Sequence, residues 1–123
     1  AQRQPRKAFF LQPLAAVGQL DLLSVDMNRP ETLARAIDGA WGVINLVGAF
    51  DGNLQRVHAE SAGRAAELAA KTGAESFVYV SAINADPESP SYYGLTKGEG
   101  ERLVRAAFPS AAIIRPSLVF GLE

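Results

Sequence analysis

The sequence predicts an α/β fold, in which a mostly parallel sheet lies between helices in a three-layer sandwich. Short apolar segments alternate with longer stretches of helical periodicity along all 123 residues. Proline and glycine mark the boundaries between these segments, and no repeat or interdomain linker interrupts the pattern. Strands that alternate with helices form parallel sheets with right-handed crossovers, so we expect one small domain of this architecture.

The first half of the chain predicts a helix, a strand and a second helix. Residues 7–16 read as a short helix that Pro13 interrupts. Residues 20–25 are apolar and bounded by a glycine and an aspartate, which favours a buried strand. The next helix begins at residue 28 or 29, because Pro30 suits a first helical turn, and Gly39 ends it.

The second half repeats the alternation of strand and helix. Residues 41–47 form a near-continuous apolar run, typical of a strand buried on both faces of a parallel sheet. An alanine-rich helix follows at 53–71, then a strand at 76–81, a helix from Tyr93 to about residue 108 and a last strand at 112–118. In such sheets ligands bind outside the carboxyl ends of the strands. The candidates at those ends are Asp26, Gly48, Ser81, Arg115 and Pro116.

Composition excludes several kinds of function. The formal net charge of −1 gives no electrostatic reason to bind nucleic acid. The sequence has no cysteine and a single histidine, so we predict no metal site. That histidine, His58, reads as a solvent-facing or structurally hydrogen-bonded side chain. No apolar run reaches the roughly eighteen residues that span a bilayer, so we expect no transmembrane helix.

Tyr93 and Lys97 are the strongest candidates for chemistry. Four residues is slightly more than one helical turn, so both side chains project from one face of a helix. A nearby ammonium favours the phenolate form of a tyrosine, which suits acid–base catalysis. The alternative is a surface helix with Tyr93 half buried and Lys97 solvated. The position of the pair, in the helix that follows the strand at 76–81, favours the functional reading.

Several segments, in this order and spacing, resemble the extended short-chain dehydrogenase/reductases: Val25-Asp26, residues 44–48, Tyr79-Val80-Ser81-Ala82, Tyr93-x-x-x-Lys97 and residues 115–121. Within that superfamily, four segments are similar to the NAD-dependent epimerase/dehydratase-like branch: residues 10–14, 45–48, 80–86 and 96–101. This branch includes the Rossmann-type accessory subunit of respiratory complex I and its bacterial relatives. The resemblance implies a Rossmann-like fold and a partial NAD(P)-binding domain over residues 1–123.

The resemblance also implies roles in holding the dinucleotide, NADP or NAD. Asp26 resembles the acid that binds the adenine amino group; alternatively, it is a turn residue before a helix. Arg3 occupies the place where relatives that favour NADPH carry an arginine for the 2′-phosphate. A guanidinium binds this dianion well. Alternatively, Arg3 is a frayed terminal residue. Four residues resemble the strand-end segment whose backbone lines the cofactor: Asn45, Leu46, Val47 and Gly48.

The remaining roles belong to the nicotinamide end of the cofactor. Tyr93 resembles the catalytic acid–base residue and Lys97 its partner, which binds the cofactor ribose. Arg115 and Pro116 resemble the stretch beside the nicotinamide, although Arg115 also fits as a buried structural cation.

Two departures from the family put catalysis in doubt. Family enzymes usually carry a catalytic serine or threonine at the position of Ala82, which has no hydroxyl. Ser81 replaces it as a catalytic residue only if its side chain faces the cleft, and adjacent strand residues face opposite ways. In addition, the family's opening strand and glycine-rich phosphate loop are missing, since Gly18 is the only glycine before the strand at 20–25. We therefore read the chain as an internal fragment of a longer protein.

These departures favour a cofactor-binding scaffold or assembly factor with little or no catalysis, partnered by complex I subunits. The alternatives are an active epimerase, dehydratase or reductase that uses Tyr93 and Lys97, and an NADPH-sensing regulator. We expect a cytoplasmic location, or a peripheral one at the inner membrane through a complex. The isolated chain should be inactive and bind dinucleotide weakly or not at all.

The truncation also has a consequence for the sheet. In the doubly wound strand order, the missing first two strands lie between the strands at 20–25 and 41–47. The strand at 41–47 then becomes an unpaired apolar edge, which invites pairing with another chain. We expect either that residues 20–25 dock directly beside it or that the fragment forms an edge-paired homodimer.

Overall fold

Strands and helices alternate along the chain after a short 3₁₀ helix. The computed structural model of the protein describes residues 4–27 and 29–119. The elements, in chain order, are η1 (Pro5–Leu14), α1 (Pro30–Ile37), β1 (Gly42–Asn45), η2 (Gln55–Glu60), α2 (Ser61–Lys71), β2 (Ser76–Val80), α3 (Tyr92–Ala107) and β3 (Ala112–Ile114).

The strands form a parallel sheet in the order β1-β2-β3. Val43 lies opposite Phe77, and Tyr79 lies opposite Ile113. The expected α/β architecture with parallel strands and helical crossovers is confirmed. β1 has β2 on one side and, among the described residues, no strand on the other, so it is the open edge that the sequence predicts.

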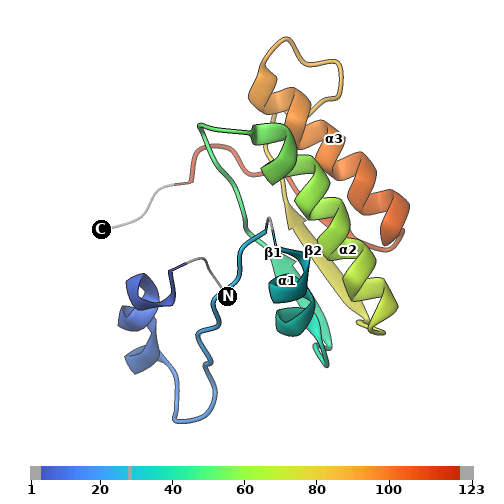
Figure 1. Ribbon diagram of the computed structural model, residues 1–123. Helices are drawn as coiled ribbons and strands as arrows, with labels where there is room; N and C mark the ends of the chain where they lie inside the picture. The colour runs from blue at the N-terminus through green and yellow to red at the C-terminus, as the bar shows by residue number, and fades with distance from the viewer. Residues whose placement is uncertain (1–3, 28, 120–123) are drawn as a thin grey trace.

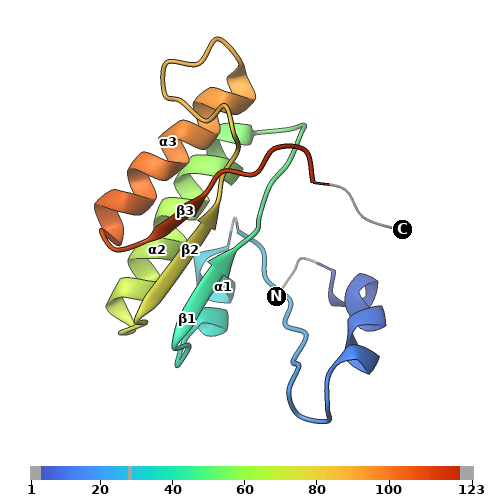
Figure 2. The same cartoon turned by 180° about the vertical axis from the view of Figure 1, so that it is seen from behind.

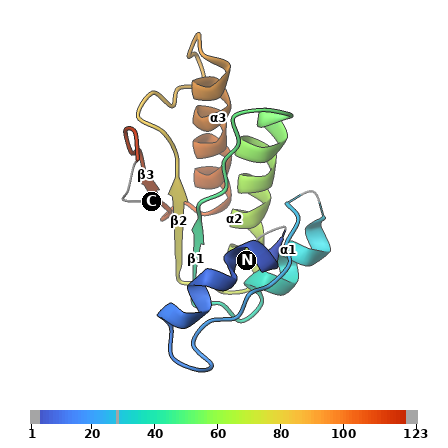
Figure 3. The same ribbon diagram turned by 90° about the vertical axis from the view of Figure 1, so that its left-hand side faces the viewer.

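The helices lie on one face of the sheet. In Figure 1, α2 and α3 cross in front of the strands and α1 lies beside α2; seen from behind in Figure 2, the strands stand in front of all of these helices. Figure 3 shows the sheet and the pair α2–α3 as two adjacent layers. The described residues therefore supply the sheet and one helical layer of the expected sandwich.

Alternation along the strands follows from this one-sided packing. The side chains of Phe77 and Tyr79 point under the helices and are 1% and 0% exposed, whereas Ile44 and Ile114 on β1 and β3 are 67% and 51% exposed. Small residues let the helices approach: Ala62, Ala66 and Ala69 of α2 are fully buried. Burying large apolar side chains such as Phe77 stabilises the fold by roughly 2–3 kcal/mol each.

The strand predicted at 20–25 was wrong. Only Ser24 forms a one-residue bridge, and this segment is not one of the strands of the three-stranded sheet, although its Val25 and Met27 line a groove together with β1. Its apolar character serves another purpose, because Val25 packs into the core beside Leu33 and Ile37 of α1.

The other elements differ from expectation mainly at their ends. The long helix predicted at 53–71 begins instead as the π-helix η2 and becomes α-helical only at Ser61. β1 ends at Asn45, where the side-chain Oδ1 accepts a 2.9 Å hydrogen bond from the Val47 N–H and turns the chain. β3 ends at Ile114, although hydrogen bonds from Ser81 N–H to Ile114 O and from Ile83 N–H to Pro116 O continue the pairing.

Candidate functional site

The end of β1 and the first turns of α3 meet at the carboxyl edge of the sheet. Gly48 follows β1, and a Cβ at that position would lie 3.8 Å from the Lys97 ammonium. The turn at Gly48 therefore lies beside Lys97, and a Cβ there would make only an ordinary van der Waals contact with the ammonium. Tyr93 and Lys97 stand one turn apart on α3, as the spacing predicts.

The amino end of α3 is fixed by close backbone packing. Ser91 caps the helix by accepting from the Gly94 N–H at 3.5 Å, and Asp86 N–H donates to Gly94 O at 3.1 Å. A Cβ at Gly98 would collide with the backbone of Asp86 and Pro87. The loop after β2 is thus seated against α3, and this contact holds Tyr93 in place.

Aromatic rings surround Tyr93. The Phe50 ring stacks on it with centroids 5.5 Å apart and planes 10° from parallel, and the His58 ring meets it edge-on at 5.0 Å. Phe50 lies in the exposed loop after β1 and is itself 91% exposed. The alternative reading of Tyr93 as half buried is correct, but the burial comes from residues of the candidate site itself.

Lys97 is buried rather than solvated. The residue is 3% exposed, its Nζ donates to Val80 O at 3.0 Å, and it lies 5.2 Å from the centre of the Tyr79 ring. Burial lowers the pKa of this ammonium. Among the described residues Val80 O is its one hydrogen-bond acceptor, so the remaining N–H groups of the ammonium can bind a ligand oxygen.

His58 is a site residue that sequence reasoning missed. It is 0% exposed, its Nε2 accepts from the Ala49 N–H at 3.0 Å, and its Nδ1 lies 3.0 Å from Thr96 Oγ1. Burial, followed by the nearby Lys97 charge, lowers its pKa to about 4. The reading as structurally hydrogen-bonded is correct and the solvent-facing one is wrong. No periodicity in the sequence pairs residue 58 with residue 96, which lies on another helix.

The Ser81 hydroxyl lies near Glu101 of α3. It is buried and makes no hydrogen bond among the described residues. It lies close enough to the Glu101 carboxylate to help lower the pKa of that group. Glu101 lies two turns along α3 from Tyr93. The side chain of Ser81 thus faces the middle of α3, which does not suit a hydroxyl that polarises a carbonyl beside Tyr93.

Arg115 is engaged by the protein itself. It forms two hydrogen bonds to Glu101, of 2.8 Å and 2.6 Å, so the alternative of a structural cation describes its contacts. Its neighbour Pro116 contributes a backbone oxygen to the pairing with Ile83.

Asp26 lies in the turn before α1, where its backbone O accepts from Arg29 N–H at 2.8 Å and interacts with the Thr32 hydroxyl. This position agrees with the alternative that Asp26 is a turn residue before a helix. The adenine-binding role of its carboxylate stays a prediction. Leu46 is 72% exposed at the edge of the sheet. Arg3 lies outside the described residues.

A groove of about 240 Å³ runs along the open edge of β1. Asn45 lies in its wall, with its side-chain Nδ2 buried and without a partner among the described residues. Its other wall includes Val25, Met27 and Leu33. An unpaired amide at a strand end is a donor available to a ligand, because leaving it unbonded costs about 1–3 kcal/mol.

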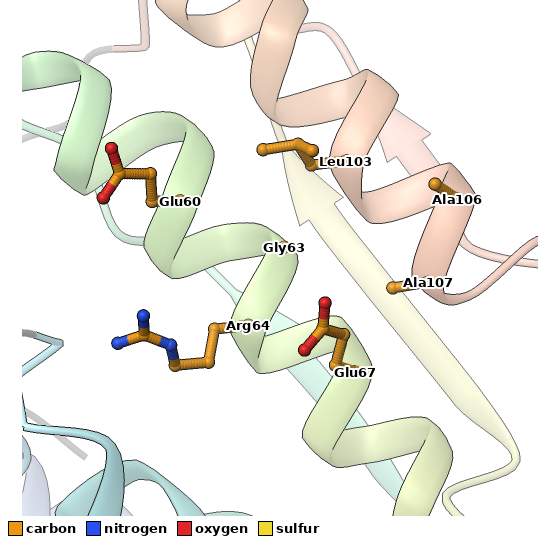
Figure 4. Close-up of a pocket in the computed structure, with 7 residues that line it drawn as sticks. All are labelled: Glu60, Gly63, Arg64, Glu67, Leu103, Ala106 and Ala107. Carbon is orange, nitrogen blue, oxygen red and sulfur yellow. The ribbon is translucent and has the colours of Figure 1, made fainter.

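A second cavity, of about 310 Å³, lies away from Tyr93 between α2 and α3. Figure 4 shows Glu60, Arg64 and Glu67 along η2 and α2, with Arg64 extending away from α3, and Leu103, Ala106 and Ala107 along α3. The residues that line it are Glu60, Gly63, Arg64, Glu67, Leu103, Ala106 and Ala107. None of them carries a group of the candidate site, so we do not include this cavity in the site.

The donors present fit one half of a nicotinamide dinucleotide. The Lys97 ammonium and the Asn45 amide suit ribose hydroxyls and a carboxamide, and Gly48 leaves the backbone open to close approach. A diphosphate needs a glycine-rich turn at a helix amino end, which the described residues do not provide. No group of three or more metal-binding side chains gathers in the described part of the chain.

A parallel α/β sheet with a glycine turn, a tyrosine and a lysine at its carboxyl edge defines a Rossmann-type nucleotide-binding protein. A family profile described as NAD(P)H-binding matches residues 3–117, and the chain belongs to this family. The class and the family predicted from the sequence are therefore confirmed.

Relatives of known sequence include both a respiratory subunit and an enzyme. The 40 kDa mitochondrial subunit of NADH-ubiquinone oxidoreductase from Neurospora crassa is 33% identical over 111 residues, which cover 87% of this chain and 30% of that protein. Ceramide reductase from Caulobacter vibrioides is 36% identical over 107 residues, covering 84% of this chain and 33% of that protein. The chain thus spans about a third of the length of these curated relatives.

The fold also matches solved structures. The triphenylmethane reductase of Citrobacter sp., solved in complex with NADP(H), superimposes with a TM-score of 0.75 at 18% identity, over 95% of this chain and 39% of that one. At this level of identity the similarity shows the fold. Within residues 4–27 and 29–119, none of the helices combines the length and hydrophobicity that a bilayer crossing requires.

Proposed function

We propose that the protein containing this chain binds NAD(P)H across the carboxyl edge of the sheet and serves as an accessory or assembly subunit with little or no catalysis. The buried Lys97 ammonium beside the turn at Gly48 carries the cofactor proposal, because a Cβ added at Gly48 would lie 3.8 Å from that ammonium. The relationship to the Neurospora crassa subunit supports respiratory complex I as the assembly, peripheral to the membrane.

Each candidate residue would contact a different part of the cofactor. The Lys97 ammonium binds the nicotinamide ribose, and the backbone from Asn45 to Gly48 lines the dinucleotide. Asp26 reaches the adenine and Arg3 the 2′-phosphate where the cofactor is NADP. Arg115 and Pro116 border the nicotinamide, with Arg115 acting from its position on Glu101. When bound, the nicotinamide supplies a site that accepts or releases hydride.

Three observations support a protein with little catalysis. Ala82 lacks the hydroxyl that family enzymes use beside the tyrosine. Ser81 interacts with Glu101, which favours a structural role for its hydroxyl. Phe50 stacks on the Tyr93 ring, so an apolar side chain borders the residue that would exchange a proton. Such an arrangement binds a dinucleotide without assembling the polar groups that orient a carbonyl substrate.

A second candidate is an active reductase, epimerase or dehydratase. The pairing of Tyr93 with Lys97 on one face of α3 favours it, as does the relationship to a ceramide reductase. In that case Tyr93 would give a proton to, or take one from, a substrate oxygen. A third candidate, an NADPH-sensing regulator, would bind the cofactor without turnover and change its affinity for a partner on binding.

Calorimetric titration of the full-length protein with NADPH and NADH tests the binding proposal. We expect binding of at least one of them, weakened about tenfold or more by Lys97→Met, because a charge-assisted hydrogen bond is lost. Lys71→Met, at the exposed end of α2, is the matched control and should bind like the wild type. Equal affinity in Lys97→Met and Lys71→Met would contradict the assignment of Lys97.

Turnover separates the first candidate from the second. The full-length protein is incubated with NADPH and with carbonyl substrates, and loss of absorbance at the nicotinamide band is followed. The proposal expects no turnover. Turnover that Tyr93→Phe abolishes would establish the enzyme instead, and binding without turnover that alters partner affinity would establish the regulator.

A further inference from the structure

The His58 ring joins two segments that border the candidate site. On one side its Nε2 accepts from the Ala49 N–H, in the loop directly after Gly48. On the other side its Nδ1 lies 3.0 Å from Thr96 Oγ1, and that hydroxyl lies 3.1 Å from Tyr93 O. The loop and the first turns of α3 are therefore linked through a single imidazole.

The hydrogen bonds define the form of this ring. A backbone N–H can only donate, so Nε2 must carry a lone pair and the proton of the neutral ring sits on Nδ1. Nδ1–H then donates to Thr96 Oγ1, and the Thr96 hydroxyl donates to Tyr93 O. Each donor in the chain finds an acceptor, which makes the arrangement self-consistent.

The position of His58 is itself tightly constrained. It lies in the π-helix η2, a form that often occurs at functional sites. Its backbone oxygen accepts from the Tyr79 hydroxyl at 2.9 Å, and a Cβ at Gly100 would collide with that oxygen. The ring has therefore little freedom to move away from the loop or from α3.

We propose that His58 is the positioning residue that holds the turn after Gly48 against the Tyr93 turn of α3, and so keeps the two walls of the dinucleotide site at a fixed separation. The ring does not need to touch the cofactor. It acts through the Ala49 amide on one wall and through Thr96 on the other. The cofactor part of this inference rests on the proposed function, whereas the link itself does not.

The groups that face the ring favour its neutral form. Lys97 of α3 places a positive charge near it, Tyr93 of α3 packs against its edge, and Tyr79 of β2 binds its backbone oxygen. No carboxylate is among the groups that act on its titration. A second proton on Nε2 would face the Ala49 N–H donor and break the link, so acid should release the loop.

The first test needs no variant. In the full-length protein, long-range ¹H–¹⁵N spectra of the His58 ring report which nitrogen carries the proton, and hydrogen exchange reports protection of the Ala49 amide. We expect the Nδ1–H tautomer, which is the minor form of free histidine, and a slowly exchanging Ala49 amide. The Nε2–H tautomer, or an Ala49 amide that exchanges as fast as an open loop, would overturn the proposal.

Thr96→Val then removes one hydroxyl at nearly constant volume, and Thr96→Ser restores it. We expect Thr96→Val to speed Ala49 exchange and to raise the Kd for NADPH about fivefold, as for the loss of one buried hydrogen bond. Thr96→Ser should return both towards wild type. The stability control is Phe77→Leu, a core change under α2 that does not touch His58 and should leave the Kd unchanged.

The outcomes separate the link from the cofactor. If Phe77→Leu raises the Kd as much as Thr96→Val does, the effect is general destabilisation and the positioning role is overturned. If Thr96→Val leaves the His58 tautomer, the Ala49 exchange rate and the Kd for NADPH unchanged, the hydrogen bond to Thr96 does not position the loop and the proposal fails. If the wild type binds neither NADPH nor NADH, the proposed function fails, and the tautomer and exchange data decide separately whether His58 holds the loop.

Discussion

The guanidinium of Arg115 donates two hydrogen bonds, of 2.8 Å and 2.6 Å, to the two carboxylate oxygens of Glu101. The contact joins the chain beyond β3 to the middle of α3. Burial alone would raise the pKa of Glu101. The hydrogen bonds from Arg115, the nearby Ser81 hydroxyl, and the positive charges of Arg115 and Arg105 outweigh burial, so the pKa of Glu101 is lowered. The carboxylate is 8% exposed and the guanidinium 51%, so the pair lies at the border of the core.

Arg115→Met should destabilise the protein. The change leaves a mostly buried carboxylate without its partner, and we expect a loss of about 1–2 kcal/mol in free energy of unfolding, reduced from the fully buried value because half of the guanidinium meets solvent. Urea unfolding of the full-length protein measures it. Arg102→Met removes a more exposed pair with Glu99 and should have little effect. If Arg115→Met unfolds like the wild type but binds NADPH more weakly, Arg115 contacts the cofactor instead of stabilising the fold.

His58 should make stability depend on pH between 7 and 5. Its pKa is about 4 in the folded protein and near 6.5 when unfolded, so the unfolded state takes up the proton first as pH falls. The contribution is fully present above pH 6.5 and is lost on the way down to pH 4. Linkage gives a loss of about 2 kcal/mol in free energy of unfolding between pH 7 and pH 5.

Urea unfolding at a series of pH values, compared with His58→Phe, isolates this effect. The phenylalanine keeps the ring contact with Tyr93 and cannot take up a proton, so its stability should fall less between pH 7 and pH 5. Glu99 and Glu101 have lowered pKa values, and their contributions are lost at lower pH, outside this window. An equal acid slope in wild type and variant would show that His58 is not the group responsible.

Local patterns were sufficient for most of the fold. The strand at Ser76–Val80 and the helix that begins at Tyr92 were predicted within one residue of their observed bounds, because alternation and capping signals act over short stretches of chain. The shared face of Tyr93 and Lys97 follows from helix geometry in the same way. The open edge at β1 followed from strand order together with the absence of a phosphate loop.

Contacts between distant segments were not predictable in this way. The apolar run at 20–25 is as suitable for core packing as for a strand, and only its neighbours decide between the two. The burial of Lys97 depends on the backbone carbonyl of Val80, and the role of His58 on a threonine in another helix. Such pairings are set by packing, for which a single sequence carries no periodic signal.

Gly100 should tolerate no side chain. A Cβ there would collide with the His58 backbone oxygen and lie 2.6 Å from the Tyr79 hydroxyl, which would force η2 away from α3. We expect Gly100→Ala to lower the free energy of unfolding by about 3 kcal/mol or more, through overpacking and loss of the Tyr79 bond. The matched control is Gly42→Ala in β1, whose nearest neighbours lie at 3.6 Å. Similar unfolding midpoints for both variants would contradict the close packing.

The open edge of β1 should make the isolated 123-residue chain self-associate. β1 pairs with β2 alone among the described strands; its residue Ile44 is 67% exposed, and the flanking Trp41 and Leu46 are 70% and 72% exposed. Apolar edges of this kind pair with a second copy, whereas lysine on an edge opposes pairing. Light scattering after gel filtration should show a dimer for the wild type and a monomer for Ile44→Lys. Leu14→Lys, an equally charged change on exposed η1, should remain dimeric. A wild-type chain that stays monomeric at high concentration would rule out the edge-paired dimer.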